Sequence, residues 1–436
     1  MQVQRGEIAV ELDLLAHNLP VLMNVVEQSA LVFGMQGKDA LALTLAAEEV
    51  FNYLCARTDV KEGMRTVCKN GIYYVQIDFI FPCSNLDLRA FNLAADLDLE
   101  DDSQLEEMGL LIAARSVDRL FISDEPGRSM ILTLYKEKRY PAIEAQAPRT
   151  VEERTRFSIK PPDNEDLKSF CRLAVATLGD TGGLPPFMTY PGKFVDMIRS
   201  GEYEAALAFD ERQAVAGGIV WRARARKTVE LYGPYLLAKA EGMPEALIEH
   251  CLEQTGRSEA VGIINRSGAA DLGKQYFEEL GTVVNYQTDG LAQKATAYYR
   301  QLCEEPGQRI WAPMDLLPYL QSEYQRLFLP RDIRVVSNMG EHSNRHSVFS
   351  AELGSKQAIL RPLLSGGDAA ANLTRHLQLL SREKVLNIFF EMDLGIAWHA
   401  GMIPALLEQG FKPCLILPYA GQGDLLLMQF RAGDAQ

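Results

Sequence analysis

Residues 227–254 read KTVELYGPYLLAKAEGMPEALIEHCLEQ, and they decide the fold of the middle of the chain. The β-branched and aromatic residues of Lys227–Leu237 predict a strand, and the apolar spacing of Pro244–Gln254 predicts a helix. Between the two lies the loop Lys239-Ala-Glu-Gly242-Met-Pro244. Proline is tolerated in the first turn of a helix, so this sequence predicts a strand, a short glycine-containing loop and a helix start.

The flanking segments extend this stretch to the order β-α-β-β-β-α-β-α-β, which predicts a mixed sheet with helices on its faces. The predicted strands are Arg156–Lys160, Glu204–Phe209, Ala214–Trp221, Lys227–Leu237, Ala260–Asn265 and Thr282–Gln287, and the predicted helices are Glu165–Leu178, Pro244–Gln254 and Leu272–Leu280.

Basic residues alternate along Trp221-Arg-Ala-Arg-Ala-Arg-Lys227. Every second side chain of a strand points to the same side, so this pattern is typical of the solvated face of a strand. Binding of an anion is the alternative interpretation.

The chain has 436 residues, with 44 Lys and Arg against 58 Asp and Glu, and a formal net charge of −14. The length predicts about three domains. A stretch of Pro and charge with weak periodicity at 141–165 and a polar stretch with a Gly/Pro break at 286–314 place the units at 1–145, 150–290 and 310–436. We interpret the second stretch as a polar helix followed by a break. The acidic balance argues against general binding of nucleic acid or an anionic membrane.

Seven scattered cysteines without CxxC spacing predict reduced thiols in a cytoplasmic protein and no metal site.

Units one and three also mix strands and helices, so the predicted class is α+β or α/β throughout. In unit one we expect strands at Glu7–Leu14, 71–82, Leu120–Ser123 and Ser129–Lys136, and helices at Leu19–Phe33, Lys38–Arg57 and Leu105–Val117. In unit three we expect strands at Ile333–Val336, Ser347–Glu352, Gln357–Pro362, Val385–Glu391, Cys414–Pro418 and Asp424–Arg431, and helices at Ala369–Leu380 and Met402–Gln409.

Unit two resembles the GNAT family of acyl-CoA N-acyltransferases over about residues 154–287, and unit three resembles a second, partial copy that lacks the family's basic glycine loop. The family binds the CoA pyrophosphate with backbone N–H groups at a helix start, where the helix dipole favours anions. The resemblance implies acetyl-CoA or a related acyl-CoA as the cofactor, bound by Leu236, Leu237, Lys239, Ala240, Gly242, Met243 and Asn265. An ordinary strand–helix turn remains the alternative for this loop.

The same resemblance suggests catalytic residues, because an amine must lose a proton and the leaving thiolate must gain one. Glu230 matches the frequent position of the base, and Tyr276 neighbours the usual position of the acid, which is Phe277 here. The alternative for Glu230 is a carboxylate at a strand edge.

Unit one resembles the histidine-kinase-like (GHKL) ATPases, especially the anti-sigma-factor kinases, in a two-layer sandwich. Glu48 and Asn52 match the family's Glu-x-x-x-Asn box, and Gly109 matches one glycine of its later Gly-rich box. An alternative register pairs Glu49 with Tyr53. The adenine-reading Asp and Gly are missing near Phe81–Asn85, so ATP and Mg²⁺ binding is doubtful, and the alternative is that Glu48 and Asn52 only solvate a helix face.

Two functions follow from these resemblances. The first is an acyl-CoA-dependent N-acyltransferase that acts on a small-molecule or protein amine, with unit one as a regulatory domain. The second is a non-catalytic regulatory protein, in which unit one is a pseudo-ATPase that binds a sigma factor or an anti-sigma antagonist. In that case the transferase fold serves as a ligand sensor or scaffold. We expect no nucleic-acid or membrane partner.

Overall fold

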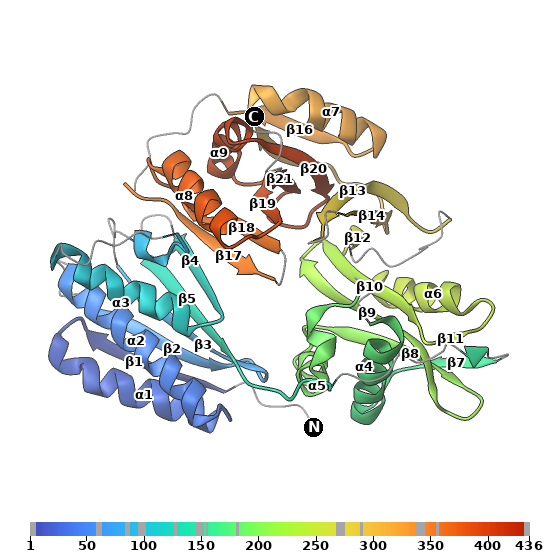
Figure 1. The fold of residues 1–436 in the computed structure, drawn as a ribbon, viewed down its shortest axis with the longest axis horizontal. Helices are drawn as coiled ribbons and strands as arrows, with labels where there is room; N and C mark the ends of the chain where they lie inside the picture. The colour runs from blue at the N-terminus through green and yellow to red at the C-terminus, as the bar shows by residue number, and fades with distance from the viewer. Residues whose placement is uncertain are drawn as a thin grey trace.

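The computed structural model describes residues 6–57, 63–82, 88–94, 102–125, 129–144, 152–153, 156–179, 183–266, 275–287, 291–336, 345–354 and 357–430. The described residues form three units that lie at the corners of a triangle (Figure 1).

Unit one is a two-layer sandwich of an antiparallel sheet and helices. Its described strands have the order β1-β2-β3-β5-β4, with β1 at Glu7–Asp13, β2 at Gly63–Asn70, β3 at Tyr74–Phe81, β4 at Arg119–Glu125 and β5 at Ser129–Glu137. The helices are α1 (Leu19–Val32), α2 (Gly37–Arg57) and α3 (Asp102–Ser116), with short 3-10 turns at Ala16–Asn18 and Arg89–Phe91 (η2). Alternate β3 residues such as Val75 and Ile77 join the helices in one core, so the helices cover one face of the sheet.

Unit two is built on a seven-stranded sheet with the order β13-β14-β12-β10-β9-β8-β7. The strands are β7 (Phe157–Lys160), β8 (Glu204–Asp210), β9 (Val215–Ala225), β10 (Thr228–Leu236), β12 (Gly262–Asn265), β13 (Glu278–Tyr286) and β14 (Ala292–Gln301). A separate two-residue pairing joins β6 (Glu152–Glu153) to β11 (Ala238–Lys239). Helices α4 (Asn164–Leu178) and α5 (Pro191–Arg199), with a 3-10 turn at Pro186–Thr189, pack on one face, and α6 (Met243–Thr255) packs on the other.

Unit three repeats part of this arrangement. Its main sheet has the order β17-β18-β19-β21-β20, and β18 and β19 are parallel like β10 and β12. The elements are β15 (Gln308–Ala312), a 3-10 turn at Met314–Leu316, α7 (Leu317–Arg326), β16 (Arg331–Val335), β17 (Val348–Leu353), β18 (Gln357–Leu364), α8 (Ala369–Arg382), β19 (Asn387–Asp393), α9 (Ala397–Glu408), β20 (Phe411–Leu417) and β21 (Leu425–Phe430).

Most predicted elements are confirmed within a few residues, and two predictions are wrong. The polar helix expected within 286–314 is replaced by β14 and β15, so the sheet of unit two runs past residue 290. The helix expected at Leu272–Leu280 is replaced at its end by β13, and residues 271–274 lie outside the described part of the chain. Helix α7 was not expected from the sequence.

Each pair of units is in contact. Units two and three meet where the Gln429 side chain donates to the carbonyl of Val284 on β13 (2.6 Å). Units one and two meet where the Tyr140 hydroxyl donates to Asp196 on α5 (2.7 Å). Units one and three share a core, because Val348 of β17 belongs to the apolar cluster of unit one.

A buried asparagine completes the contact between units one and three. Asn92, which follows η2, is 2% exposed. Its amide donates to the carbonyl of Ser347 (2.9 Å) and accepts from the N–H of Phe349 (2.9 Å) and from Asn372 of α8 (3.0 Å). One side chain of unit one therefore satisfies backbone groups of unit three.

Among the described helices, none combines the length and the apolar composition needed to cross a membrane.

Replacing Asn92 with alanine should lower the free energy of unfolding by about 1–3 kcal/mol, because the buried N–H of Phe349 loses its acceptor. Urea denaturation of the full chain measures this change. Asn24 lies exposed on α1, so Asn24→Ala is the control and should change stability by less than about 0.5 kcal/mol. Equal effects of the two variants would contradict the role given to Asn92.

Candidate functional site

A fork opens between two parallel strands of unit two. Strands β10 and β12 pair from Thr228↔Gly262 to Leu231↔Asn265. Beyond that point β10 continues to Leu236 beside β9, but its ladder with β12 has ended. Asn265 is fully buried at the base of the fork, and its amide donates to the carbonyl of Gly233 (3.1 Å). Among the described residues, no strand pairs with β10 on the β12 side beyond Leu231, and we call this divergence the fork.

The far end of β10 leads into the loop predicted to bind phosphate. Gly242 is the N-cap of α6 with φ 74°, a left-handed conformation that favours glycine, and no side chain caps it. A Cβ built on Gly242 meets nothing within 4 Å, so the helix start is open. Lys239 and Glu241 are exposed, whereas Met243 is fully buried and anchors the helix in the core. Leu237 is held by its N–H, which donates to the carbonyl of Ala216 (2.9 Å).

Glu230 does not stand free at the fork. It is 2% exposed on β10, and it is bound by Arg222 of β9 (2.9 Å), by Arg266 after β12 (2.9 Å) and by Arg224 (3.4 Å). Burial by itself raises the pKa of this carboxyl, but Arg266, Arg224 and Arg222 together hold its pKa well below the usual range. Such a carboxylate is a weak proton acceptor, and these surroundings favour a positioning role over that of a general base.

A second buried glutamate extends this network into unit three. Glu391 of β19 is bound by Arg224 (2.6 Å), by Arg361 of β18 and more distantly by Arg266 (3.6 Å). Burial raises its pKa, but Arg224, Arg361 and Arg266 lower it to about 2. We call Arg222, Arg224, Arg266 and Arg361, with Glu230 and Glu391, the arginine cluster. It ties β9 and β10 to β18 and β19.

The interpretation of the alternating basic residues as a solvated strand face is wrong for Arg222 and Arg224. Their side chains are 26% and 11% exposed and belong to the arginine cluster, whereas Arg226 is 83% exposed and pairs with Glu259 on the surface. The sequence signal for these arginines was their spacing at every second residue. Glu391, the partner of Arg224, lies 167 residues away in the chain, so the local sequence could not reveal this pairing.

The structure does not bring the two predicted catalytic residues together. Val229 and Leu231 belong to the core beneath α6, so Glu230, which alternates with them, faces the opposite side of the sheet. Tyr276 lies on the α6 side, where its hydroxyl donates to Glu249 (2.9 Å). The catalytic role of each residue stays a prediction.

Unit three contains a loop in the place where unit two has its glycine loop. It runs from β18 through Gly366 and Gly367 to Asp368 at the start of α8. A Cβ on Gly366 would lie 2.2 Å from the backbone nitrogen of Ser347. Asp368 accepts from that nitrogen (2.7 Å) and contacts His346 (3.0 Å). The chain's own backbone therefore covers this loop.

The residues predicted to bind nucleotide lie on α2 and α3. Glu48 is half-buried and Asn52 is exposed on α2. Gly109 is buried on α3, where an added Cβ would lie 2.2 Å from a carboxylate oxygen of Glu49, so the glycine permits close packing of the two helices. Burial and the neighbouring Glu48 raise the pKa of Glu49. Residues 83–87, which should carry the adenine-reading box, lie outside the described residues, and the nucleotide role stays a prediction.

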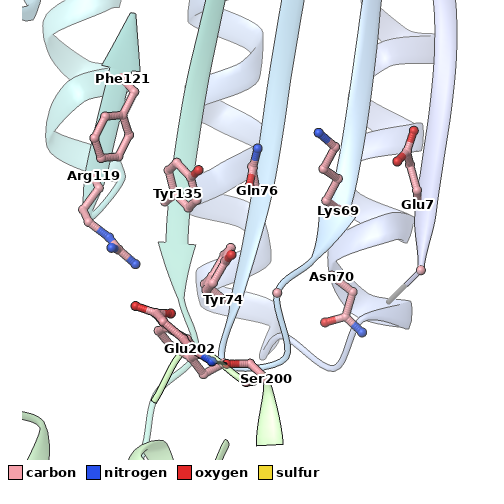
Figure 2. Close-up of a pocket in the computed structure, with 14 residues that line it drawn as sticks. Glu7, Lys69, Asn70, Tyr74, Gln76, Arg119, Phe121, Tyr135, Ser200 and Glu202 are labelled. Carbon is pink, nitrogen blue, oxygen red and sulfur yellow. Dashed lines mark hydrogen bonds between the residues drawn. The ribbon is translucent and has the colours of Figure 1, made fainter. Parts of the chain in front are cut away.

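A pocket of about 530 Å³ lies where the open face of unit one meets unit two. Figure 2 shows Arg119, Tyr135, Gln76 and Lys69 side by side on neighbouring strands, with Glu202 of unit two near Arg119. The carbon of the Arg119 guanidinium lies 5.2 Å from the centre of the Tyr135 ring. This pocket was not expected from the sequence, because two units build it.

No family model matches this sequence, and no curated protein matches it. Solved structures of acetyltransferases do match part of it. A GNAT superfamily phosphinothricin acetyltransferase from Sinorhizobium meliloti, solved with AcCoA, is 19% identical, with 34% of this chain and 88% of that chain covered and a TM-score of 0.29.

Two further matches cover a similar share of this chain. The ribosomal-protein-S5-alanine acetyltransferase from Vibrio fischeri is 8% identical (36% and 98% covered, TM-score 0.28). A GNAT family acetyltransferase from Staphylococcus aureus is 14% identical (34% and 100% covered, TM-score 0.25). Likeness at this level does not assign an activity to the chain.

The two buried glutamates should make the free energy of unfolding depend on pH in the acidic range. Folding lowers the pKa of Glu391 from its ordinary 4.5 to about 2, so its contribution is complete above pH 4.5 and is lost as the pH falls towards 2. Glu391→Gln should therefore be less stable than the wild type at pH 7, and the difference should shrink between pH 4.5 and 2. Urea denaturation of both proteins across this range tests the prediction. A difference that does not change with pH would contradict it.

Proposed function

We propose that unit two binds an acyl-CoA and transfers its acyl group to an amine. One observation carries the proposal: a single strand, β10, leads from an open fork to an uncapped helix start. The backbone edge at the fork suits the amide-containing arm of an acyl-CoA, and the start of α6 suits its phosphates. The predicted resemblance to N-acyltransferases supports the same assignment.

The residues of the loop have separate tasks in this proposal. Lys239 is exposed and supplies positive charge, Gly242 leaves room for phosphate, and buried Met243 fixes the start of α6. We assign Leu236, Leu237 and Ala240 to contacts with the acyl-CoA between the fork and the loop. Two features weaken the site: Pro244 offers no N–H, and exposed Glu241 repels phosphate.

The chemistry needs no covalent bond to the protein. The amine nitrogen attacks the thioester carbonyl carbon, the carbon–sulfur bond breaks, and the thiolate receives the proton that the amine releases. The chain aligns the two reactants at the fork. Because Glu230 is held as a carboxylate by three arginines, we assign it the positioning of those arginines.

Gly242→Trp should weaken acetyl-CoA binding at least 10-fold, because the indole fills the space needed by phosphate. Gly34→Trp is a matched control, since Gly34 is exposed, also has a positive φ (85°), and an added Cβ there would meet only the end of the Lys138 side chain at 3.6 Å. Calorimetry on the full chain measures both. Absence of binding by the wild type, or equal binding by both variants, would overturn the proposal.

Lys239→Gln should weaken acetyl-CoA binding about 3- to 10-fold at low salt, and the difference should narrow as salt screens the charge. Lys38→Gln, at an exposed position of α2, is the control and should have no effect. A Lys239→Gln deficit that does not depend on salt would argue against a phosphate contact.

A regulatory role is the second candidate, and the pocket of unit one favours it. The pocket has the size of small-molecule sites and lies between two units, where such sites are common. Glu202 of this pocket contacts Arg222 (3.9 Å), so a ligand there would act on the arginine cluster. If the wild type binds no acetyl-CoA, this candidate becomes the leading one.

A further inference from the structure

We infer that the amine substrate carries a carboxylate group, which the arginine cluster binds at the junction of units two and three. This inference rests on the proposed function. It concerns the acceptor, whereas the phosphate loop concerns the acyl donor.

Four guanidinium groups contact four carboxylates, but only two of these, Glu230 and Glu391, are buried at the centre of the cluster. The remaining acidic partners lie at its two ends. Glu352 is 67% exposed, and Glu202 lies 3.9 Å from Arg222 and also accepts from Tyr73. Half of the positive charge is thus balanced only by carboxylates at the ends, and an anion bound at the centre would neutralise charge there.

Several guanidinium N–H groups of the arginine cluster lack a hydrogen-bond acceptor within normal distance. Nη1 of Arg222 lies 3.9 Å from Glu202 and Nη1 of Arg266 lies 3.6 Å from Glu391, and both distances exceed a hydrogen bond. Nε of Arg224 is buried and has no hydrogen-bond partner among the described residues. A planar carboxylate can accept two parallel N–H groups from a guanidinium, which makes it a suitable ligand.

The cluster also lies where an acceptor has to be. Arg266 directly follows Asn265, the last paired residue of β12, so it begins the far side of the fork. Arg222 is paired with Glu230 across β9 and β10, on the face away from α6. An acyl arm that starts at α6 and enters the fork therefore points towards these arginines.

Aromatic rings hold one of these arginines in place. The Arg222 guanidinium lies 5.3 Å from the centre of the Tyr203 ring and 6.0 Å from that of Tyr232. The side chains of Arg222, Arg266 and Arg361 are 26%, 24% and 32% exposed, so each is partly accessible to solvent.

Malonate is a suitable probe, and the uncharged malonamide is its control. Calorimetry on the full chain at constant ionic strength should detect malonate binding, at least 10-fold tighter than any binding of malonamide or phosphate. Arg266→Lys keeps the positive charge but loses the planar guanidinium group with its parallel N–H donors, so it should weaken malonate binding at least 10-fold. Arg361→Lys is a second such variant, in case the first does not fold. Arg226→Lys, on the exposed Arg226, should bind malonate like the wild type.

Measuring acetyl-CoA binding distinguishes failure of this inference from failure of the proposed function. Arg266→Lys should keep its affinity for acetyl-CoA, and malonate should bind together with acetyl-CoA. The inference is overturned if malonate does not bind, binds no better than phosphate, or displaces acetyl-CoA. It is also overturned if both lysine variants bind malonate as tightly as the wild type. In each case the proposed function stands. If malonate binds as expected but acetyl-CoA does not, the proposed function fails and the acceptor assignment fails with it.

Discussion

The pairing of two buried glutamates with four arginines is the constraint on which the arrangement of units two and three depends. Glu230 and Glu391 come from strands of different sheets, and Arg224 and Arg266 each contact both. Removing one partner would leave a charge buried without its counter-ion, which is far more costly than losing a surface pair. The same requirement fixes the strand edges on which the fork and its loop are built.

Units two and three share an arrangement of elements, but the loop after the first parallel strand differs between them. In unit two the loop after the first parallel strand is open at Gly242. In unit three the corresponding loop is covered by His346 and Ser347, and Asp368 takes the place where an anion would bind. Unit one then docks through Asn92 onto the same Ser347. One copy therefore keeps an accessible helix start, and the other provides a surface for assembly.

The sequence was sufficient for the elements with strong local signals. The apolar spacing of α2 and the glycine loop before α6 were visible within a few residues. The strand predicted at Thr282–Gln287 matches the second half of β13, but β14 was missed because its polar residues resemble a helix or a linker when their partners are unknown. The buried state of Arg222 and Arg224 depends on Glu230 and Glu391, and the latter comes from another unit. Burial of charge is a tertiary property, so the alternating pattern alone could not reveal it.

The shared core of units one and three has a consequence for how the protein unfolds. Val348 and Leu364 of unit three lie in the same apolar cluster as the helices of unit one, and units one and two meet at Tyr73 and Glu202. Each unit is thus bounded by two others in a closed ring (Figure 1). Separating one unit would expose apolar surface of its neighbour, so we expect the folding of the three units to be thermodynamically coupled and the chain to unfold in fewer steps than it has units.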